Sequence, residues 1–528
     1  MIVSRQLYFT INLEEIFYFN KKKCRIYAAF GVSQTPIILN QSERRNMKNR
    51  SLKLNTVLNV VKQLCSVLFP LITIPYVTRT LQATNYGKVN FSSSIISYFV
   101  LFAAFGINNY SIREGGQIRN RKEEFTKFAS EVFSINCWTT FMSYIGLIGL
   151  LIFSVKIREY SLLIIIQSLS IILSTLGANW VNTIYEDYLF ITIRYIVMQV
   201  ISFVCLFVFV HKPEDYVVYT IIHVIATAGG NLFNIPYIRR YVKLKFTFNV
   251  NFRKHMIPLL LLFFNEVAFA IYVNSDITIL GILKTEQDVG IYSLAVKIYT
   301  VVKTILNSII TVSMPRLAAY LGEKRLVDYR KLCKKVFTST LTLLLPAIIG
   351  MTMLASNILY IVSGEEYVAG SISFRVLSVS LLFAVAVAFY GNCVLIPNRK
   401  EKVCLIAACI SAILNISLNF IIIPLISYNG AAITTLISEA LTAFIYVVYS
   451  RKYLERVIEP RDALSIFIGS VSVGITCFIV EKSIFSVYGS VVIAILLSVL
   501  VFFATQIILK NSIVVKCLES IFKKKICK

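Results

Sequence analysis

The sequence predicts an all-α polytopic membrane protein: about 14 transmembrane helices in two six-helix lobes around a central cavity, followed by a C-terminal helix pair. Apolar runs of roughly 18 to 25 residues follow one another from Val57 to Leu509, and each is long enough to cross a bilayer. The segments between these runs are alternately rich and poor in Lys and Arg. With 57% hydrophobic and 15% charged residues, the chain has too few polar side chains to cover an ordinary soluble surface.

The apolar runs define fourteen expected spans. Their bounds are 57–77, 89–110, 129–154, 161–181, 196–211, 217–237, 257–281, 289–312, 336–361, 371–395, 403–423, 430–449, 463–481 and 489–509. An even number of spans places both chain ends on the same side of the membrane. Pro70 and Pro75 fall inside the first span, where they are expected to kink the helix, either as a hinge or as a static feature.

The connecting segments predict the orientation. The segments 111–128, 183–195, 238–255, 314–335, 397–403, 450–462 and 510–528 hold 32 Lys and Arg residues, whereas the segments on the opposite side hold 7. By the positive-inside rule the basic set, and with it both termini, is cytoplasmic. The formal net charge of +26 is therefore explained by topology, and a nucleic-acid-binding surface is not expected.

The loops also repeat along the chain. Long basic segments follow the second and the eighth span, and the first and seventh spans start 200 residues apart, at Val57 and Ile257. The pattern suggests an N-lobe (47–240) and a C-lobe (241–450) inserted in the same direction, then a terminal helix pair with a basic tail (451–528). Residues 1–46 lack a cleavable signal-peptide pattern. They form either a loose cytoplasmic extension or a stretch before a true start at Met47, which is the favoured interpretation.

Polar side chains inside the spans mark surfaces that face protein or water, because lipid offers them no hydrogen bonds. In the first, second, seventh and eighth spans they recur on one helical face. The four stripes comprise Asn55, Asn59, Lys62, Ser66 and Thr73; Asn90, Ser94, Ser97 and Asn108; Asn265, Tyr272 and Asp276; and Tyr292, Tyr299, Lys303 and Asn307. Hydrogen bonding between helices is one explanation. The presence of stripes in corresponding helices of both lobes favours a shared hydrated cavity.

Cations inside the spans are candidate binding residues, because a Lys at the bilayer centre costs roughly 2.5 to 3.5 kcal/mol. Lys297 and Lys303 lie near the middle of the eighth span, about 120° apart around the helix. Lys62 lies inside the first span, where its ammonium group either serves the cavity or reaches the interface. Arg79 and Arg113 are further candidates. For Arg79 an anchor at the interface is the favoured alternative, and for Arg113 an interfacial ion pair with Glu114.

Three acidic residues are candidates for ion coupling. Glu266 and Glu439 are central in their spans, and Asp276 belongs to the seventh-span stripe. Each glutamate is either half of a buried ion pair with a lysine or a protonatable coupling site. The sequence leaves both alternatives open.

Neither catalysis nor a cofactor is expected. The eleven cysteines are scattered without metal-ligand spacing, so no metal site is predicted. No phosphate-binding loop for ATP is present. The segments on the poorly charged side are too short to hold a catalytic domain. The sequence therefore predicts a protein that is not an enzyme.

Three stretches carry a family resemblance: LFPLITIPYVTRTLQATNYGKVNF (68–91), NSDITILGILKTEQDVGIYSLAVKIY (274–299) and LNISLNFIIIPLISYNGAAITTLISE (414–439). They resemble the first helix, the seventh-to-eighth junction and the eleventh-to-twelfth stretch of polysaccharide flippases, the Wzx-type branch of the multidrug/oligosaccharidyl-lipid/polysaccharide exporter superfamily. The chain departs from the family pattern at Gln82-Ala83-Thr84, where relatives usually carry a Gly-Pro-like turn.

The resemblance implies two helical bundles around a cavity that opens alternately to each side. It also implies a cargo, an undecaprenyl-diphosphate-linked oligosaccharide of O-antigen, capsule or exopolysaccharide synthesis. The cargo would move from the inner to the outer leaflet of the bacterial cytoplasmic membrane. Lys62, Lys297 and Lys303 would then meet the diphosphate. Amides, hydroxyls and aromatic side chains such as Asn59, Tyr299 and Asn307 would meet the sugars.

Other functions compete with this one. A cation-coupled multidrug exporter of the same superfamily would need acidic, aromatic-lined pockets, which the mid-membrane lysines disfavour. A membrane polysaccharide polymerase or ligase would need a large outer loop, and a non-transporting scaffold is a further alternative. The expected partners are the lipid-linked oligosaccharide, membrane lipids, and the polymerase and chain-length proteins of the same pathway.

Overall fold

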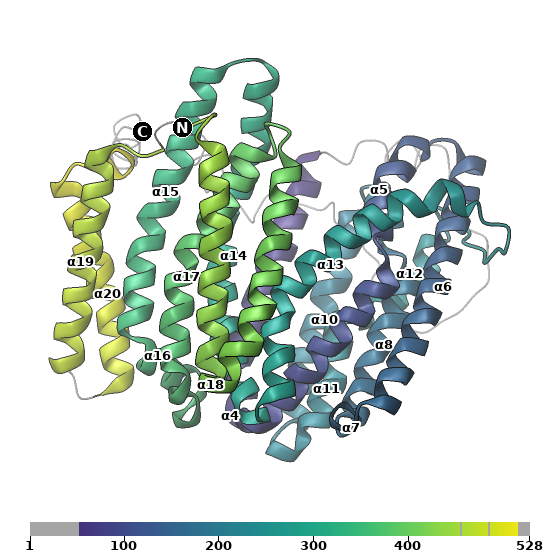
Figure 1. Ribbon diagram of the computed structural model, residues 1–528, viewed down its shortest axis with the longest axis horizontal. Helices are drawn as coiled ribbons and strands as arrows, with labels where there is room; N and C mark the ends of the chain where they lie inside the picture. Colours follow the sequence, from purple (N-terminus) through teal and green to yellow (C-terminus); the bar gives the residue numbers. More distant parts are fainter. Residues whose placement is uncertain (1–51, 455–456, 484–485, 516–528) are drawn as a thin grey trace, which may run out of the picture.

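Long apolar helices account for almost all of the described structure. The computed structural model describes residues 52–454, 457–483 and 486–515, so the expected extension 1–46 lies outside it. Ten helices of this part are long and apolar enough to cross a membrane (Figure 1). The predicted all-α polytopic fold is confirmed.

The first half of the chain forms one group of helices, coloured purple to blue in Figure 1. In this group α4 packs against α6, α8 and α10, and we call the group the N-terminal bundle. Its helices are α4 (Leu52–Ala104), α5 (Ile107–Ile118), α6 (Lys122–Phe153), α7 (Val155–Arg158), α8 (Ser161–Gly177), α9 (Asn179–Ile184), α10 (Tyr188–Phe209), α11 (Tyr216–Val224) and α12 (Gly230–Ile238).

The second half forms the C-terminal bundle, followed by two further helices. The bundle comprises α14 (Glu286–Gly322), α15 (Leu326–Met353), α16 (Ala355–Ser363), α17 (Ser371–Phe389) and α18 (Glu401–Ser450). Next come α19 (Pro460–Ser483) and α20 (Val487–Ile508), which pack on each other; α19 also packs on α15. Between the bundles, α13 (Phe252–Leu283) runs obliquely and contacts α4, α5 and α18 (Figure 1). The residue bounds of the two lobes and the terminal pair stay a prediction.

In two places, two predicted spans form one nearly continuous helix that is interrupted by only one or two non-helical residues. α4 is interrupted at Gln82 (φ 61°, ψ 172°), and α18 at Ile426 and Ser427 (φ 51°, ψ −133° at Ser427). Pro70 and Pro75 both have helical backbone, so neither is the point at which α4 breaks. These two double helices, together with α8 and α13, account for the difference between ten long helices and fourteen predicted spans.

The two ends of the helices differ in charge. α5 and the turn between α14 and α15 lie at the top of Figure 1 and belong to the Lys- and Arg-rich segments. We call this side the basic end. α7 lies at the opposite side of Figure 1, which we call the distal end. The turn of α4 after Gln82 lies at this end, because Gly87 contacts Glu286 and Glu286 accepts a hydrogen bond from Tyr160, two residues after α7. The 3-10 helix Glu365–Gly370 lies beside it, since Glu366 accepts a hydrogen bond from the backbone N–H of Ala83. That the basic end is cytoplasmic stays a prediction.

The predicted start of the fifth span is wrong. The segment 183–195 is largely helical, because α10 begins at Tyr188 and the expected span began at 196. Arg194 therefore lies in the second turn of a membrane helix, where its residue is 9% exposed. Its charge lowers the hydropathy of the run to which it belongs, and this is why the sequence pattern placed the helix start after it.

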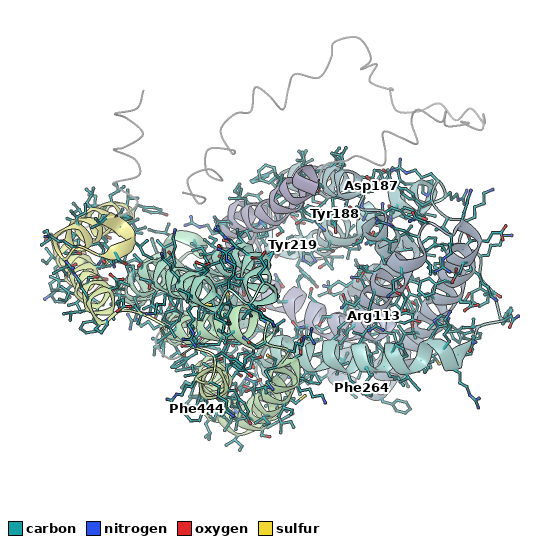
Figure 2. The ribbon with its side chains drawn as sticks, turned by 90° about the horizontal axis from the view of Figure 1, so that it is seen from above. Arg113, Asp187, Tyr188, Tyr219, Phe264 and Phe444 are labelled. Atoms are coloured by element: carbon teal, nitrogen blue, oxygen red, sulfur yellow. The ribbon has the colours of Figure 1, made fainter. Side chains whose placement is uncertain are left out.

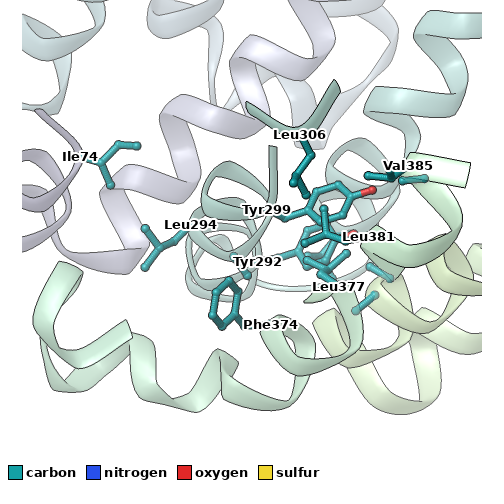
Figure 3. Packing of buried hydrophobic residues seen from close by; sticks show 14 of the residues in the cluster. Ile74, Tyr292, Leu294, Tyr299, Leu306, Phe374, Leu377, Leu381 and Val385 are labelled. Atoms are coloured by element: carbon teal, nitrogen blue, oxygen red, sulfur yellow. The ribbon is translucent and has the colours of Figure 1, made fainter. Parts of the chain in front are cut away.

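The hydrophobic core joins the two bundles. Tyr292 and Tyr299 of α14 pack with Leu377 and Leu381 of α17, and Ile74 of α4 belongs to the same cluster (Figure 3). Burying such side chains against protein rather than lipid gains little hydrophobic free energy, so close packing and polar contacts must hold the helices together.

Candidate functional site

α14 changes character along its length. All seven residues from 289 to 295 are buried. Further along the same helix, five exposed polar residues recur every three or four positions and so share one face: Lys297, Thr300, Thr304, Ser308 and Thr311. We call them the α14 polar face. A lysine and four hydroxyls in a membrane-spanning helix indicate a surface that faces water-accessible space.

Lys297 is the charged member of this face. The residue lies within electrostatic reach of His223, which belongs to α11 of the N-terminal bundle. Within the described part of the chain, Lys297 has no ion-pair partner. Tyr219 lies one turn before His223 on α11 and is seen from above in Figure 2. The sequence predicted a cation at this depth, and in the described part of the structure Lys297 is exposed and has no ion-pair partner.

At the distal end the two bundles meet backbone to backbone. A β-carbon added at Gly87 of α4 would lie 1.8 Å from the carbonyl oxygen of Glu286, and one added at Gly290 would lie 1.9 Å from that of Ala83. Only glycine permits such an approach. We call this contact, with the hydrogen bonds that surround it, the distal seal.

Hydrogen bonds reinforce the distal seal. The backbone N–H of Ala83 donates to Oε2 of Glu366 at 2.9 Å, and Thr78 Oγ1 donates to Ser363 Oγ at 2.7 Å. The predicted binding residue Arg79 belongs to this end. Its Nη2 donates to the carbonyl oxygen of Ile361 at 2.7 Å, so the structure separates Arg79 from the α14 polar face.

A buried ion pair occupies the C-terminal bundle. Lys303 Nζ donates to Glu439 Oε1 at 2.9 Å, and Tyr299 donates its hydroxyl to the same oxygen at 3.1 Å. The exposed fraction of the side chain is 28% for Lys303 and 4% for Glu439. Of the two alternatives for Glu439, the structure shows the ion pair with a lysine. Lys303 and Lys297 thus differ in chemistry: the first is neutralised and the second is free of an acid.

Asp276 of α13 is buried among neutral donors. Asn419 Nδ2 donates to Oδ1 of Asp276 at 2.7 Å, the Tyr292 hydroxyl donates to Oδ2 at 3.0 Å, and Thr435 Oγ1 also donates to Oδ2. Asn415 joins the group, since its Oδ1 accepts from Asn419 at 3.0 Å. No lysine or arginine of the described part pairs with this carboxylate.

The remaining predicted residues are dispersed. Arg113 pairs with Glu114 at 2.9 Å on the surface of α5 (Figure 2), as one alternative expected. Glu266 accepts a hydrogen bond of 2.9 Å from Asn109 Nδ2. The side-chain oxygen of Asn307 is buried without a hydrogen-bond partner. The side chain of Asn59 lies outside the described structure.

Ser94 of the second-span stripe takes part in helix packing. Thr278 Oγ1 of α13 donates to Ser94 Oγ of α4 at 3.0 Å, and the Tyr98 hydroxyl lies 3.2 Å from Thr278 Oγ1. These contacts join α4 to α13, which is the interhelical explanation offered for such stripes.

The structure places the predicted residue Lys62 near a second cation, Arg194, which sequence reasoning missed. Lys62 of α4 is partly buried, with Nζ 5.8 Å from the centroid of the Tyr195 ring, and lies within electrostatic reach of Arg194. Arg194 donates from Nη2 to Asn179 Oδ1 at 2.5 Å. The available signal was the pair of Asn-x-x-Asn spacings at 179–182 and 231–234, which places amides on one face of each of two helices.

Comparison of the sequence with known families identifies a transporter of the multidrug/oligosaccharidyl-lipid/polysaccharide exporter superfamily. Within it, the chain belongs to the polysaccharide biosynthesis protein family, whose model matches residues 52–321. This is the Wzx-type flippase branch, a family of transporters and not of enzymes. A second family model, MatE, matches residues 262–421.

Curated relatives agree with the family. The chain is 25% identical over 419 residues to a "Putative O-antigen transporter" of Escherichia coli (strain K12), covering 77% of this chain and 98% of the relative. It is 23% identical over 265 residues to a capsular polysaccharide biosynthesis protein of Staphylococcus aureus, covering 49% of this chain and 65% of that one. Among solved structures, the fold is similar to the lipid II flippase MurJ in an inward closed conformation. The TM-score is 0.69 at 16% identity, over 87% of this chain and 99% of that one.

Proposed function

We propose that this protein moves an undecaprenyl-diphosphate-linked oligosaccharide from the inner to the outer leaflet of a bacterial cytoplasmic membrane. The cargo would be a repeat unit of O-antigen, capsule or exopolysaccharide. Membership of the polysaccharide biosynthesis family supports a cargo of this class. The observation that carries the proposal is the α14 polar face, because it combines exposed hydroxyls with an unpaired lysine in a membrane-spanning helix.

The chemistry of this face suits the headgroup of such a lipid. A diphosphate needs a cation in place of its hydration shell, and Lys297 has no acid that competes for its charge. Hydroxyls of Thr300, Thr304 and Ser308 give the sugars hydrogen-bonding partners. The polyprenyl chain can stay in the surrounding lipid, so only the headgroup has to cross on the protein.

Transport by alternating access would need two ends that open in turn. In the conformation described here the two bundles are in close contact at the distal end through Gly87 and Gly290, while the α14 polar face, which follows Gly290 along the helix toward the basic end, is exposed. With the basic end assigned to the cytoplasm by its charge, this is the arrangement of a carrier ready to receive cargo from inside. Release would then require separation of the distal seal.

Asp276 is our candidate for coupling transport to an ion. A buried carboxylate that has neutral donors and no cationic partner is costly to keep charged in a low-dielectric interior. A proton or a bound cation removes that cost, so occupancy of this group can favour one arrangement of α13, α14 and α18 over another. The Lys303–Glu439 pair lacks this property, because each charge already has its counter-charge.

The decisive experiment measures which leaflet displays the lipid-linked oligosaccharide. A strain of the source bacterium without this protein is complemented with wild type, Lys297→Ala or Lys331→Ala, and a membrane-impermeant sugar probe reports the outer leaflet. Lys331 is an exposed lysine of α15 near the basic end and serves as the matched control. We expect inner-leaflet accumulation without the protein, relieved by wild type and Lys331→Ala and not by Lys297→Ala. Normal leaflet distribution in the deletion strain would reject the proposal.

The MatE match supports one alternative function, that of a cation-coupled drug exporter. Such a protein would lower the accumulation of cationic dyes in the complemented strain without altering the leaflet distribution of lipid-linked sugar. Measuring dye efflux in the same strains separates the two functions. Interaction with polymerase and chain-length proteins of the pathway remains our expectation for its protein partners.

A further inference from the structure

Arg194 is a buried cation that forms no ion pair within the described residues. Its residue is 9% exposed, Nη2 donates to the amide oxygen of Asn179 at 2.5 Å, and Nη1 has no hydrogen-bond partner. The nearest acids in the sequence are engaged elsewhere: Glu186 pairs with Arg119 at 2.9 Å, and Asp187 pairs with Arg240. The guanidinium group also lies 5.8 Å from the centroid of the Phe190 ring, but neither this contact nor the neutral amide oxygen supplies a negative charge, so its burial is costly.

The second cation makes this cost larger. Lys62 of α4 lies within electrostatic reach of Arg194, and in an interior of low dielectric two like charges repel strongly. No carboxylate of the described part pairs with either residue. Two neighbouring cations of α4 and α10 that pair with no acid of the described residues favour the binding of an anion between these helices.

Unpaired hydrogen-bond donors surround the same place. Asn234 Nδ2 donates to Asn182 Oδ1 at 2.8 Å and to Asn179 Oδ1 at 3.4 Å, which connects these amides to Arg194. Within this connected group, Asn182 Nδ2 has no hydrogen-bond partner in the part of the chain that the structure describes. The single unpaired acceptor is Asn234 Oδ1. Donors in excess around a cation are what a phosphate, with its several acceptor oxygens, would satisfy.

We propose that Arg194 and Lys62 bind a phosphate group of a lipid-linked ligand between α4 and α10, with Asn182 contributing a neutral N–H. The identity of the ligand as the diphosphate of a polyprenyl-linked oligosaccharide rests on the proposed function. Lys297 would bind the same headgroup from the C-terminal bundle, so the two bundles would share one ligand. The unpaired oxygen of Asn234 would accept from a hydroxyl of the phosphate or of the first sugar.

The test uses the purified full-length chain in detergent and farnesyl diphosphate as the probe. The measured quantity is the shift of the thermal unfolding midpoint with probe concentration. Arg194→Gln keeps a side-chain amide that can donate to Asn179 and removes the charge. We expect its apparent affinity for the probe to fall roughly 10- to 100-fold, the size of a lost charged hydrogen bond. Lys62→Gln should weaken binding in the same direction, and Arg194→Lys should lose less than Arg194→Gln.

The unliganded protein gives a second readout that a merely structural arginine would not produce. Because Arg194→Gln removes an uncompensated buried charge, we expect its probe-free unfolding midpoint to equal or exceed that of wild type. Arg121→Gln, which changes an exposed arginine paired with Glu124, is the matched control and should bind the probe as wild type does. Retention of wild-type probe affinity by Arg194→Gln would overturn the proposal, as would a lowered midpoint without any change in affinity.

Two further arms separate the possible sources of the anion and the two proposals. Dioleoyl phosphatidic acid tests a phospholipid headgroup, and farnesol tests the chain alone. A stronger Arg194-dependent response to phosphatidic acid than to the diphosphate would reject the diphosphate ligand. If Arg194→Gln flips lipid normally in the leaflet assay and binds the probe as wild type does, the proposed phosphate site is rejected and the proposed function is unaffected. If probe binding depends on Arg194 but deletion of the protein leaves the leaflet distribution of the lipid-linked oligosaccharide normal, the site is supported and the proposed function is rejected.

Discussion

Gly290 of α14 and Ala83 of α4 are so close that a β-carbon on the glycine would lie 1.9 Å from the alanine carbonyl oxygen. The contact joins helices from different bundles at the distal end. Backbone cannot yield as a flexible side chain can, so a methyl group at position 290 has to push the two helices apart. The distal seal therefore depends on the absence of a side chain.

Gly290→Ala should hold the distal end open. We expect loss of transport in the leaflet assay together with increased labelling of Ser293→Cys, which is buried behind the seal, by an impermeant maleimide added from outside. The measurement is made in a background without other cysteines. Gly350→Ala is the control, because a β-carbon there meets nothing within 4 Å. Wild-type transport and labelling in Gly290→Ala would show that the seal tolerates the methyl group.

We expect the α14 polar face to be accessible to water. Thr304 and Ile305 are adjacent and both exposed, but they point in directions about 100° apart around the helix. Thr304→Cys should react with a soluble maleimide at least about tenfold faster than Ile305→Cys, because a thiol in lipid does not form the reactive thiolate. Equal rates at the two positions would mean that the hydroxyls of α14 face lipid.

The Lys303–Glu439 pair should behave as a coupled unit. Lys303→Met leaves Glu439 buried without its counter-charge and should cost about 3 kcal/mol of unfolding free energy. Glu439→Gln should cost a similar amount by leaving the ammonium unpaired. The double variant should be more stable than the sum of the single effects predicts, because neither charge remains. Thermal unfolding in detergent measures all three, and strict additivity would show that the two residues do not interact.

Asp276→Asn should separate transport from its driving force. The amide keeps the size of the side chain and removes the charge that a proton or metal cation would neutralise. We expect wild-type flipping to accelerate when a proton or sodium gradient is imposed on vesicles, and the variant to give the same rate with and without the gradient. Asp328→Asn, which alters an exposed aspartate paired with Arg325, should respond like wild type. A gradient response retained by Asp276→Asn would assign coupling to another group.

The sequence predicted the fold from patterns that are local. Apolar run length and charge alternation follow from the thickness and polarity of a membrane, and both survive in the structure. The helix breaks were harder to predict from the sequence. Gln82 and Ser427 both have positive φ although neither is a glycine, so their residue types did not predict a turn. The departure from the family pattern at Gln82 was the one sequence signal at these breaks.

The site was predicted in part, for a physical reason. Lys297 and Lys303 were equivalent in the sequence, since both lie deep in one span. Their difference depends on whether an acid from another helix lies opposite, and Glu439 is 136 residues from Lys303 along the chain. Arg194 was missed for the opposite reason: its charge resembled that of a loop, and the amides that hold it belong to other helices.

The breaks in α4 and α18 also bear on how the protein is made. Each double helix turns back at the distal end within one or two residues, so no separate polar loop has to be carried across the membrane on its own. The two halves of such a hairpin must enter the bilayer together, with the charged flanks of both halves retained on the side of synthesis. Biogenesis would then proceed in pairs of helices, and a substitution that stiffens Gln82 or Ser427 would impair insertion before it could impair transport.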